Sequence, residues 1–327
     1  MKLIGFMAIA LAMILGSGSC HSNSNSNAAQ PDTADLAAAA VPQFSGDSAL
    51  AFAKTQCDFG PRVPATEAHK LCAQWLTATM QRLCDSAWIQ HGEATTFDGK
   101  HLQLSNIIGV VNPDAEQRIL LMAHWDCRPW ADNDPDPANH RKPVMGANDG
   151  ASGVAVLLEL ARQMKAKRPN VGVDIVLVDA EDWGSSDDED SWALGTQYWA
   201  AHPHYDDASK PMFGIVVDMV GASGAKFARE YLSMQYAQNF VEMVWSAAAE
   251  AGFGAYFTDG NGGGVTDDHI AVNKVAGIPC LDIIDMRTDS PTGFYDGWHT
   301  THDTFDRLDA GTLHAVGQTL TAVIYSY

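Results

Sequence analysis

Residues 173–182 read Val-Asp-Ile-Val-Leu-Val-Asp-Ala-Glu-Asp, a short apolar run that ends directly in a group of carboxylates. Three other segments have the same order, with an apolar run followed by a histidine or an aspartate: residues 118–123 before His124, 213–217 before Asp218 and 278–284 before Asp285. Apolar runs of this length are typical of strands that are buried on both faces of a sheet. The four runs therefore predict the central strands of one sheet.

Helical periodicity occurs between and around these runs. Helices are predicted over residues 48–57, 67–84, 153–165, 191–201, 233–251 and 306–325, and further strands over 88–97 and 104–111. This alternation indicates an α/β fold with a mixed, mostly parallel central sheet and helices on both faces. Ligands of open sheets bind beyond the carboxyl ends of the strands. Because the polar clusters follow the strands at those ends, we expect the functional site there.

The bulk composition narrows the possible functions. The chain has 327 residues, of which 46% are hydrophobic and 18% are charged, as in an ordinary globular protein. No linker is visible within residues 41–327, so we predict one catalytic domain over that range. The formal net charge of −20 excludes a nucleic-acid-binding surface, which requires clustered lysine and arginine.

The N-terminal segment differs from the rest of the chain. The apolar run 3–15 is too short to span a bilayer, and small residues and Cys20 follow it. This order predicts a secretory signal peptide over residues 1–19 and a lipid anchor on Cys20. Since Ser17 stands where a lipoprotein signal usually has leucine, an ordinary signal peptide cleaved nearby is the alternative. Polar, low-complexity residues 20–40 predict a flexible tether.

These N-terminal features predict an exported protein of the periplasm or cell envelope, attached to the membrane only through Cys20. Export permits disulfides, but the spacing of the later cysteines matches neither a zinc finger nor a small disulfide scaffold. Their odd number leaves at least one free thiol: Cys57, Cys72, Cys84, Cys127 and Cys280. We expect Cys280 to be buried, because it lies in an apolar run.

Histidine and carboxylate side chains after the predicted strands are the candidate metal ligands. The set comprises His124, Asp126, Asp149, Glu181, Asp182, Asp218 and His299. Each residue alone has a structural explanation, such as a helix cap for Asp149 or a salt bridge for Asp218. A catalytic zinc ion usually takes three such donors from the protein. The order of the donors along the chain is therefore more informative than any one of them.

That order resembles the zinc aminopeptidase and glutaminyl cyclase clan over nearly all of residues 45–310. The motifs that carry this resemblance are His124-x-Asp126, residues 146–153 (Gly-Ala-Asn-Asp-Gly-Ala-Ser-Gly), Glu181-Asp182, Asp218 and a histidine near the C-terminus. Further stretches are most similar to the bacterial glutaminyl cyclases of the Bacteroidetes group: residues 59–64, 124–132 and 179–182, Asp267-Asp268-His269 and Trp298-His299-Thr300.

The resemblance implies a metal site with one zinc ion. Asp149, Asp182 and His299 match the three protein ligands of the single zinc in glutaminyl cyclases, and Glu181 matches their general acid/base. The cyclases of animals have glutamate in place of Asp182, a change in reach but not in donor type. The resemblance also implies a cis peptide bond between Asp149 and Gly150.

Other residues match the pocket of the cyclases. Asp218 and Asp267 match carboxylates of the hydrogen-bond network in the active site, and Trp298 matches a tryptophan of the substrate pocket. The cyclases of animals have histidine where this chain has Asp282, which leaves the role of position 282 open. The tryptophans at 130, 183 and 192 flank the motifs and are further candidates for the pocket wall.

The function that the resemblance implies is glutaminyl-peptide cyclisation. The α-amine of an N-terminal glutamine attacks the side-chain amide, and ammonia leaves. Zinc serves as a Lewis acid on the amide oxygen, and Glu181 moves the proton from the amine to the leaving nitrogen, which requires a raised pKa. The expected substrates are peptides or exported proteins with N-terminal glutamine, and we expect a monomer.

The main alternative is an aminopeptidase with two zinc ions. His124 and Asp218 match the ligands of the second metal there, Asp149 bridges the two ions, and Asp126 orients His124. Such a site would activate water and hydrolyse a peptide bond. Aminopeptidases of the clan usually have serine where this chain has Asp267.

The residue at position 298 and the intact Glu181 help to choose among the alternatives. The aminopeptidases usually have tyrosine or another residue in place of Trp298, which favours the cyclase. A third hypothesis is a lipid-anchored binding protein that kept the fold and lost the activity, since a fold alone does not guarantee function. The intact Glu181 argues against it.

Overall fold

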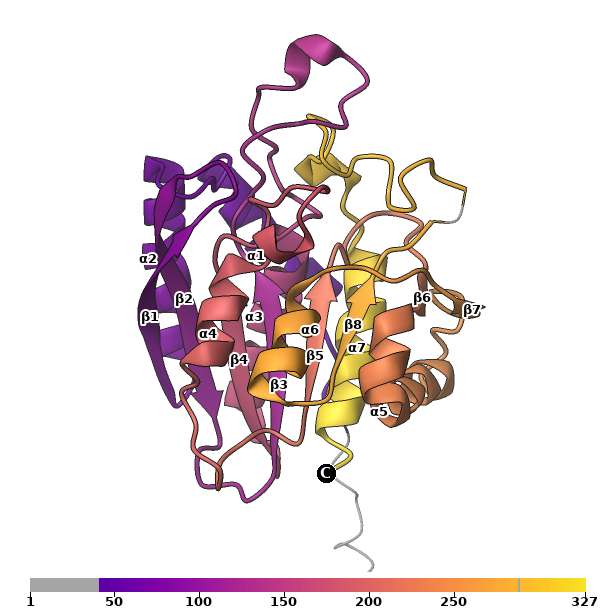
Figure 1. Ribbon diagram of the computed structural model, residues 1–327. Coiled ribbons are helices and arrows are strands. Elements are labelled where there is room, and N and C mark those ends of the chain that lie inside the picture. Colours follow the sequence, from indigo (N-terminus) through magenta and orange to yellow (C-terminus); the bar gives the residue numbers. More distant parts are fainter. Residues whose placement is uncertain (1–40, 288) are drawn as a thin grey trace, which may run out of the picture. The chain divides into compact units, whose positions relative to one another are not determined.

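A computed structural model describes residues 41–327 of the protein, apart from residue 288. The predicted signal peptide and the predicted tether lie outside the described residues, as does Cys20, and they remain predictions. Residues 41–327 form one compact unit built around a single central sheet (Figure 1). No helix in this part of the chain is long and apolar enough to cross a membrane.

The central sheet has six strands and is mixed, as predicted. Its order is β1 (Ser86–Thr95), β2 (His101–Val111), β4 (Gly172–Val178), β3 (Arg118–His124), β5 (Phe213–Asp218) and β8 (Cys280–Ile284). The pairs β1–β2 and β2–β4 are antiparallel, whereas β4, β3, β5 and β8 run parallel. The four parallel strands therefore end at the same edge, which lies at the top in Figure 1.

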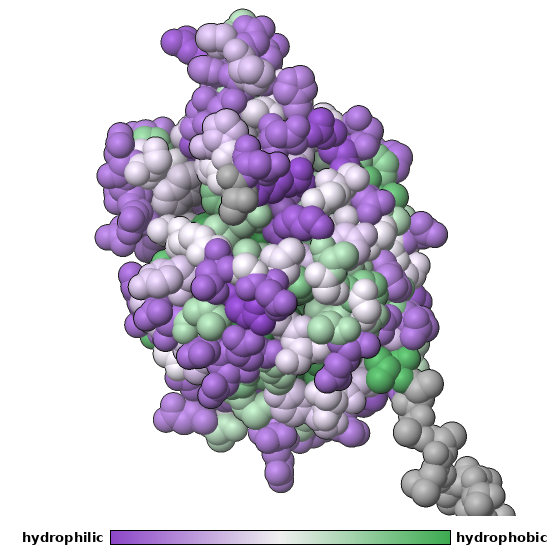
Figure 2. All heavy atoms as spheres, turned by 90° about the vertical axis from the view of Figure 1, so that its right-hand side faces the viewer, coloured by the Kyte–Doolittle hydropathy of each residue, from purple (hydrophilic) through white to green (hydrophobic). Residues whose placement is uncertain are grey.

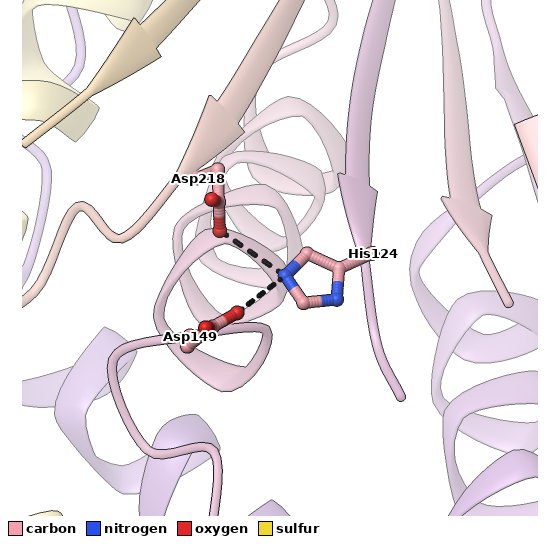
Figure 3. Close-up of side chains that lie close together, drawn as sticks. All are labelled: His124, Asp149 and Asp218. Atoms are coloured by element: carbon pink, nitrogen blue, oxygen red, sulfur yellow. Dashed lines mark hydrogen bonds and ion pairs between the residues drawn. The ribbon is translucent and has the colours of Figure 1, made fainter. Parts of the chain in front are cut away.

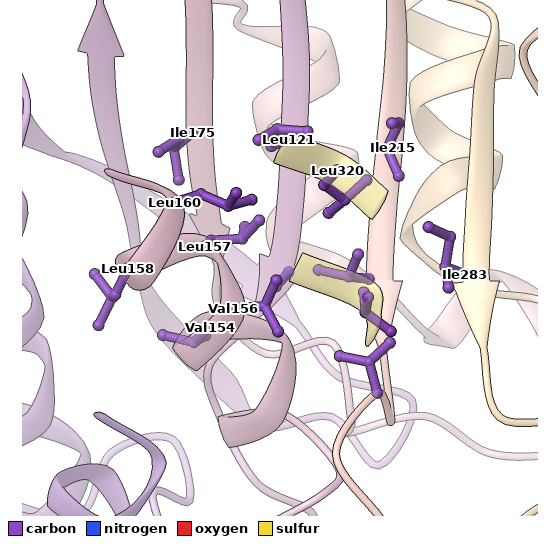
Figure 4. Close-up of a cluster of buried hydrophobic side chains, with 14 of the residues drawn as sticks. Leu121, Val154, Val156, Leu157, Leu158, Leu160, Ile175, Ile215, Ile283 and Leu320 are labelled. Carbon is purple, nitrogen blue, oxygen red and sulfur yellow. The ribbon is translucent and has the colours of Figure 1, made fainter. Parts of the chain in front are cut away.

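Helices cover both faces of the sheet. Leu121, Ile175 and Ile215 point into the larger core cluster with α1 (Gly46–Asp58), α2 (Glu67–Leu83), α3 (Ala151–Ala166), α5 (Tyr231–Glu250) and α7 (Ala310–Ile324), as Figure 4 shows in part. The alternate residues of the same strands face α4 (Leu194–Ala201), α6 (Asp268–Ala271) and the π-helical turn Val272–Ala276. The period of two places successive side chains on opposite faces, so both faces are apolar and the strands read as continuous apolar runs.

Several boundaries differ from the predictions for local reasons. Strand β8 begins at Cys280 instead of residue 278, since Pro279 has no N–H for a sheet hydrogen bond. Helix α7 begins after the 3-10 turn Phe305–Arg307, because Asp309 accepts a hydrogen bond from Thr312 N and caps the helix there. Helix α4 follows the 3-10 turn Glu189–Ser191, and a third such turn spans Pro137–Asn139.

A small parallel sheet was not predicted. It pairs β6 (Phe227–Arg229) with β7 (Phe257–Asn261). Three and five residues are too few for a clear alternation pattern, and β7 contains aspartate and glycine, which strands disfavour. All five cysteines of the described chain are free thiols, and Cys280 is buried as expected.

Candidate metal centre and active site

The candidate ligands meet at the carboxyl edge of the sheet. Their positions along the chain are widely separated: His124 ends β3, Asp149 precedes α3, Glu181 and Asp182 follow β4, Asp218 ends β5, Asp267 precedes α6 and His299 lies between β8 and α7. Parallel strands that end at one edge bring these segments together.

Asp149, Asp182 and His299 form the first donor group. One potential ligand atom of each lies within 4.8 Å of the others. His299 Nε2 is 3.1 Å from Asp182 Oδ1 and 3.7 Å from Asp149 Oδ2. All three side chains are buried, and Asp182 Oδ2 has no hydrogen-bond partner in the described structure. Two carboxylates and one imidazole suit Zn²⁺. With three protein ligands, a catalytic zinc ion keeps a fourth coordination position for water or substrate.

His124, Asp149 and Asp218 form the second donor group (Figure 3). His124 Nε2 is 3.0 Å from Asp149 Oδ1 and 3.1 Å from Asp218 Oδ1. Asp149 thus belongs to both groups, with one oxygen toward His124 and the other toward His299. Although burial disfavours its charged form, hydrogen bonding and attraction from His124 hold the pKa of Asp149 below its ordinary value.

A buried arginine holds the loop that carries Asp149. The guanidinium of Arg62 donates to the carbonyl oxygens of Trp125 (3.1 Å), Met145 (2.8 Å) and Gly146 (2.5 Å). These bonds join the segment after β3 to the segment before α3. Arg62 lies within the stretch 59–64, but no role for it could be predicted from the sequence, because its partners are backbone carbonyls that no sequence pattern marks.

Asp303 holds the same loop through its backbone N–H groups, whereas Arg62 binds its carbonyl groups. Its carboxylate accepts hydrogen bonds from the backbone N–H groups of Asn148 (2.8 Å) and Asp149 (3.1 Å), and Tyr295 donates its hydroxyl to it (3.2 Å). Burial raises the pKa of Asp303 to about 7. Asp303 was not predicted as a site residue, because the sequence marks it only by its place four residues after His299.

The peptide bond between Asp149 and Gly150 is trans, so the expected cis bond is wrong. The turn into α3 is made instead by Gly150 itself, whose φ is +94°. A side chain is excluded there, since a Cβ would lie 2.7 Å from the carbonyl oxygen of Asp126. Glycine accepts this φ without steric cost.

Asp126 and Arg128 hold the loop after β4. The carboxylate of Asp126 accepts from the backbone N–H groups of Glu181 (3.0 Å) and Asp182 (3.3 Å). It also lies 3.4 Å from Nδ1 of His124, the contact predicted for it. Arg128 Nη1 donates to the carbonyl oxygen of Asp182 (3.2 Å) and to its carboxylate (3.3 Å). The loop therefore presents both acidic side chains in a defined position.

A pocket of about 260 Å³ opens over the first donor group. Its wall includes Asp149, Glu181, Asp218, Asp267 and His299. Burial, followed by repulsion from Asp267 and other carboxylates, raises the pKa of Glu181 well above its ordinary value, although attraction from His124 opposes the shift. Burial likewise raises the pKa of Asp218 to about 7. The carboxyl group of Asp218 can thus exchange a proton near neutral pH.

Tryptophans form part of the pocket wall. Trp298 stacks on His299 with ring centroids 3.8 Å apart, and Trp192 also stacks on His299 at 6.0 Å. Both of these tryptophans line the pocket. Trp130 and Trp183 instead pack against each other in a separate apolar cluster. Of the three candidate tryptophans at 130, 183 and 192, only Trp192 reaches the pocket.

Comparison with known proteins identifies the family of the chain. The model of peptidase family M28 matches residues 106–324, a range that contains every donor of both groups. The chain belongs to peptidase family M28. Among solved structures, this M28 protein is similar to a glutaminyl cyclase of Tannerella forsythia, at 48% identity and a TM-score of 0.85, covering 88% of this chain and all of that one (100%).

Two further relatives of this M28 protein point to related activities. A Zn-dependent exopeptidase of Parabacteroides distasonis is 46% identical with a TM-score of 0.86, over 88% of this chain and 100% of the other. The glutaminyl-peptide cyclotransferase of Bos taurus is 25% identical over 298 residues, which cover 81% of this chain and 78% of that protein. The relatives thus include both an exopeptidase and a cyclotransferase.

The support of the loop by Asp303 can be tested with Asp303→Asn. Asparagine keeps only one oxygen, and its NH₂ group would face a backbone N–H, so the loop of Asp149 loses a hydrogen bond. Loss of such indirect support weakens metal binding by about 10- to 100-fold, and we expect this decrease in zinc affinity in a chelator competition assay. The exposed Asp306→Asn is the matched control. Unchanged affinity in Asp303→Asn would contradict the role.

Proposed function

We propose that the protein is a zinc-dependent glutaminyl-peptide cyclotransferase, which converts the N-terminal glutamine of peptides or proteins to pyroglutamate and releases ammonia. The observation that carries the proposal is the combination of Glu181, Asp267 and Trp298 around one pocket over the donor group Asp149, Asp182 and His299. High similarity to bacterial glutaminyl cyclases supports it.

The reaction needs one proton carrier. A C–N bond forms between the α-amine and the side-chain carbonyl carbon, and the bond to the amide nitrogen breaks. Zinc held by Asp149, Asp182 and His299 supplies Lewis-acid polarisation of the amide oxygen when bound. Glu181 takes a proton from the attacking amine and returns it to the departing nitrogen, so no net proton is consumed. Its burial in the pocket favours the raised pKa that this exchange requires.

The pocket wall serves the same reaction by positioning. Nucleophile and electrophile belong to one residue, so the enzyme needs to hold a folded conformer in which they are close. Trp298 and Trp192 present flat apolar surfaces beside His299. They limit the space available to the glutamine side chain and to water. Asp218 and Asp267, which also line the pocket, supply hydrogen-bond acceptors for the amine.

The decisive assay compares a Gln-initiated peptide with a Leu-initiated peptide of otherwise equal sequence. We expect the first to lose one ammonia molecule, detected by mass spectrometry and by a coupled ammonia assay, while both backbones stay intact. Free leucine from the second peptide would instead indicate the aminopeptidase.

Glu181→Gln provides the internal check of this assay. The amide cannot carry the proton, so we expect turnover to fall by about 10²- to 10⁴-fold while zinc content stays at the wild-type level. Glu189→Gln, an exposed acidic residue on the rim of the same pocket, is the matched control. Wild-type turnover in Glu181→Gln would exclude its assigned role.

We further propose that the catalytic centre uses one zinc ion and that His124 acts as a hydrogen-bonding residue between Asp149 and Asp218. His124→Asn then keeps the wild-type zinc content, measured by inductively coupled plasma mass spectrometry, because none of the three proposed ligands changes. If this variant lost one equivalent of zinc, the second donor group would be a metal site and the two-zinc alternative would gain support.

The cellular context is also a proposal. We infer an exported, monomeric enzyme of the periplasm or cell envelope that acts on exported peptides or proteins and is anchored by a lipid on Cys20. On the face shown in Figure 2, hydrophilic side chains predominate and apolar ones occur in small groups, which supports a monomer. We expect Cys20→Ser to move the protein from the membrane fraction to the soluble fraction. An unchanged distribution would argue against the lipid anchor.

A further inference from the structure

A second cavity adjoins the active-site pocket and has no role in the reaction proposed above. It has a volume of about 120 Å³ and lies between the segment 189–197 and the segment 266–275, which contains α6. Trp192, Thr266 and Asp267 line both cavities, as does the exposed Glu189. The two cavities are therefore immediate neighbours that share the indole of Trp192 as a wall.

The inner wall of the second cavity is largely apolar. Its apolar members are Trp192, Ala193, Ile270, Ala271 and Val275. Ile270 is half-buried, whereas Val275 is 55% exposed. Among the exposed large hydrophobic residues of the described chain, Val275 is the one that lines either of these two cavities. A ligand that covered this valine with apolar atoms would remove both surfaces from water, which is favourable.

A local widening of the helix brings Ile270 and Val275 to the same wall. Ile270 belongs to α6, and Val275 belongs to the π-helical turn Val272–Ala276 that follows it directly. In an α-helix, side chains three and four residues apart share a face, whereas the hydrogen bonds of a π-helical turn span five residues. Side chains five apart can thus meet at one cavity. Such turns occur frequently at functional sites.

The opposite wall is held by hydrogen bonds within its own segment. Gln197 donates through Nε2 to the carbonyl oxygens of Asp190 and Trp192, at 2.8 Å each. The indole N–H of Trp192 donates to the carbonyl oxygen of Ser185 (3.1 Å), and the guanidinium carbon of Arg128 lies 5.0 Å from the ring centre. The cavity is therefore formed before a ligand arrives, which reduces the entropy lost on binding.

Charged residues lie only at the rim of the cavity and include both signs. Glu189, Asp190 and Lys274 are all exposed there. Water and salt screen exposed charges, so each attracts a ligand weakly. The acidic excess of the rim disfavours a carboxylate, but the apolar wall is what distinguishes the remaining side chains.

We propose that this cavity is the subsite for the residue that follows the N-terminal glutamine, and that it selects an aliphatic side chain of medium size, such as leucine or methionine. This inference rests on the proposed cyclase function. With glutamine in the active-site pocket, the next Cα atom is only about 3.8 Å away, so its side chain reaches the neighbouring cavity. A cavity of about 150 Å³ can hold benzene, and about 120 Å³ is enough for one such side chain.

The test measures ammonia release from peptides of the form Gln-X-Ala-Ala-amide, in which X is glycine, leucine, lysine or aspartate. We expect kcat/KM for the leucine peptide to exceed that for the glycine peptide by about 10-fold, because an apolar pocket discriminates by about this factor or more. The lysine and aspartate peptides stay below the leucine peptide. A lysine peptide that exceeded the leucine peptide would overturn the proposal, because the rim carboxylates would then determine the choice.

Variants of the wall assign the preference to this cavity. In Val275→Ser the wall loses two methyl groups, and we expect the ratio of kcat/KM for leucine over glycine to fall by about threefold. Ile270→Ala lowers the same ratio. Val41→Ser is the matched control, because Val41 is also an exposed valine and lines neither cavity; it keeps the wild-type ratio. Both peptides are measured on one preparation, so any loss of folded protein cancels in the ratio.

The outcomes separate this subsite from the function on which it rests. Equal kcat/KM for the glycine and leucine peptides, or a wild-type ratio in both Val275→Ser and Ile270→Ala, refutes the subsite and leaves the cyclase intact. No ammonia from any of the peptides refutes the proposed function, and the subsite falls with it.

Discussion

The carboxylate of Asp149 joins the two donor groups of the site, because it belongs to both. Its two oxygens face different histidines, His124 at 3.0 Å and His299 at 3.7 Å. A carboxylate can bridge in this way only if its backbone is held, and here the loop before α3 is held by Arg62 through its carbonyls and by Asp303 through its N–H groups. The loop thus has charged, buried partners for both kinds of backbone group.

The topology explains why these partners are available. Strands β3, β4 and β5 are adjacent and parallel, so the segments that follow them meet without long connections. The segment between β8 and α7 then crosses this edge and delivers both His299, a proposed ligand, and Asp303, the support of Asp149. One segment therefore closes the metal site and also stabilises its opposite side.

Much of the fold could be predicted from the sequence because strands buried on both faces are almost purely apolar. The runs before His124 and Asp218 carried that signal, and polar residues directly after them located the site. The small sheet of β6 and β7 was not predicted, because its strands are too short to show an alternation of apolar and polar residues. The roles of Arg62 and Asp303 could not be predicted, because these residues bind backbone groups whose positions depend on the tertiary structure.

Position 282 shows what could not be predicted from the sequence. In the sequence, Asp282 is an acidic residue inside an apolar run, and its role stayed open. The structure places it beside Asp267 and His269, which lie at the start of α6, and this contact between separate elements could not be read from the sequence. The trans bond before Gly150 is a second case, since the geometry of a turn depends on the space around it.

The proposed cyclisation of glutamine at this site uses no water, whereas hydrolysis does. The most direct measurement runs the reaction of a Gln-initiated peptide in water enriched in oxygen-18 and determines the mass of every product. We expect a pyroglutamyl peptide that is lighter than the substrate by one ammonia molecule and free of the label. Release of a free amino acid or a glutamyl peptide that carries oxygen-18 in a new carboxyl group would contradict it, because that oxygen can come only from hydrolysis.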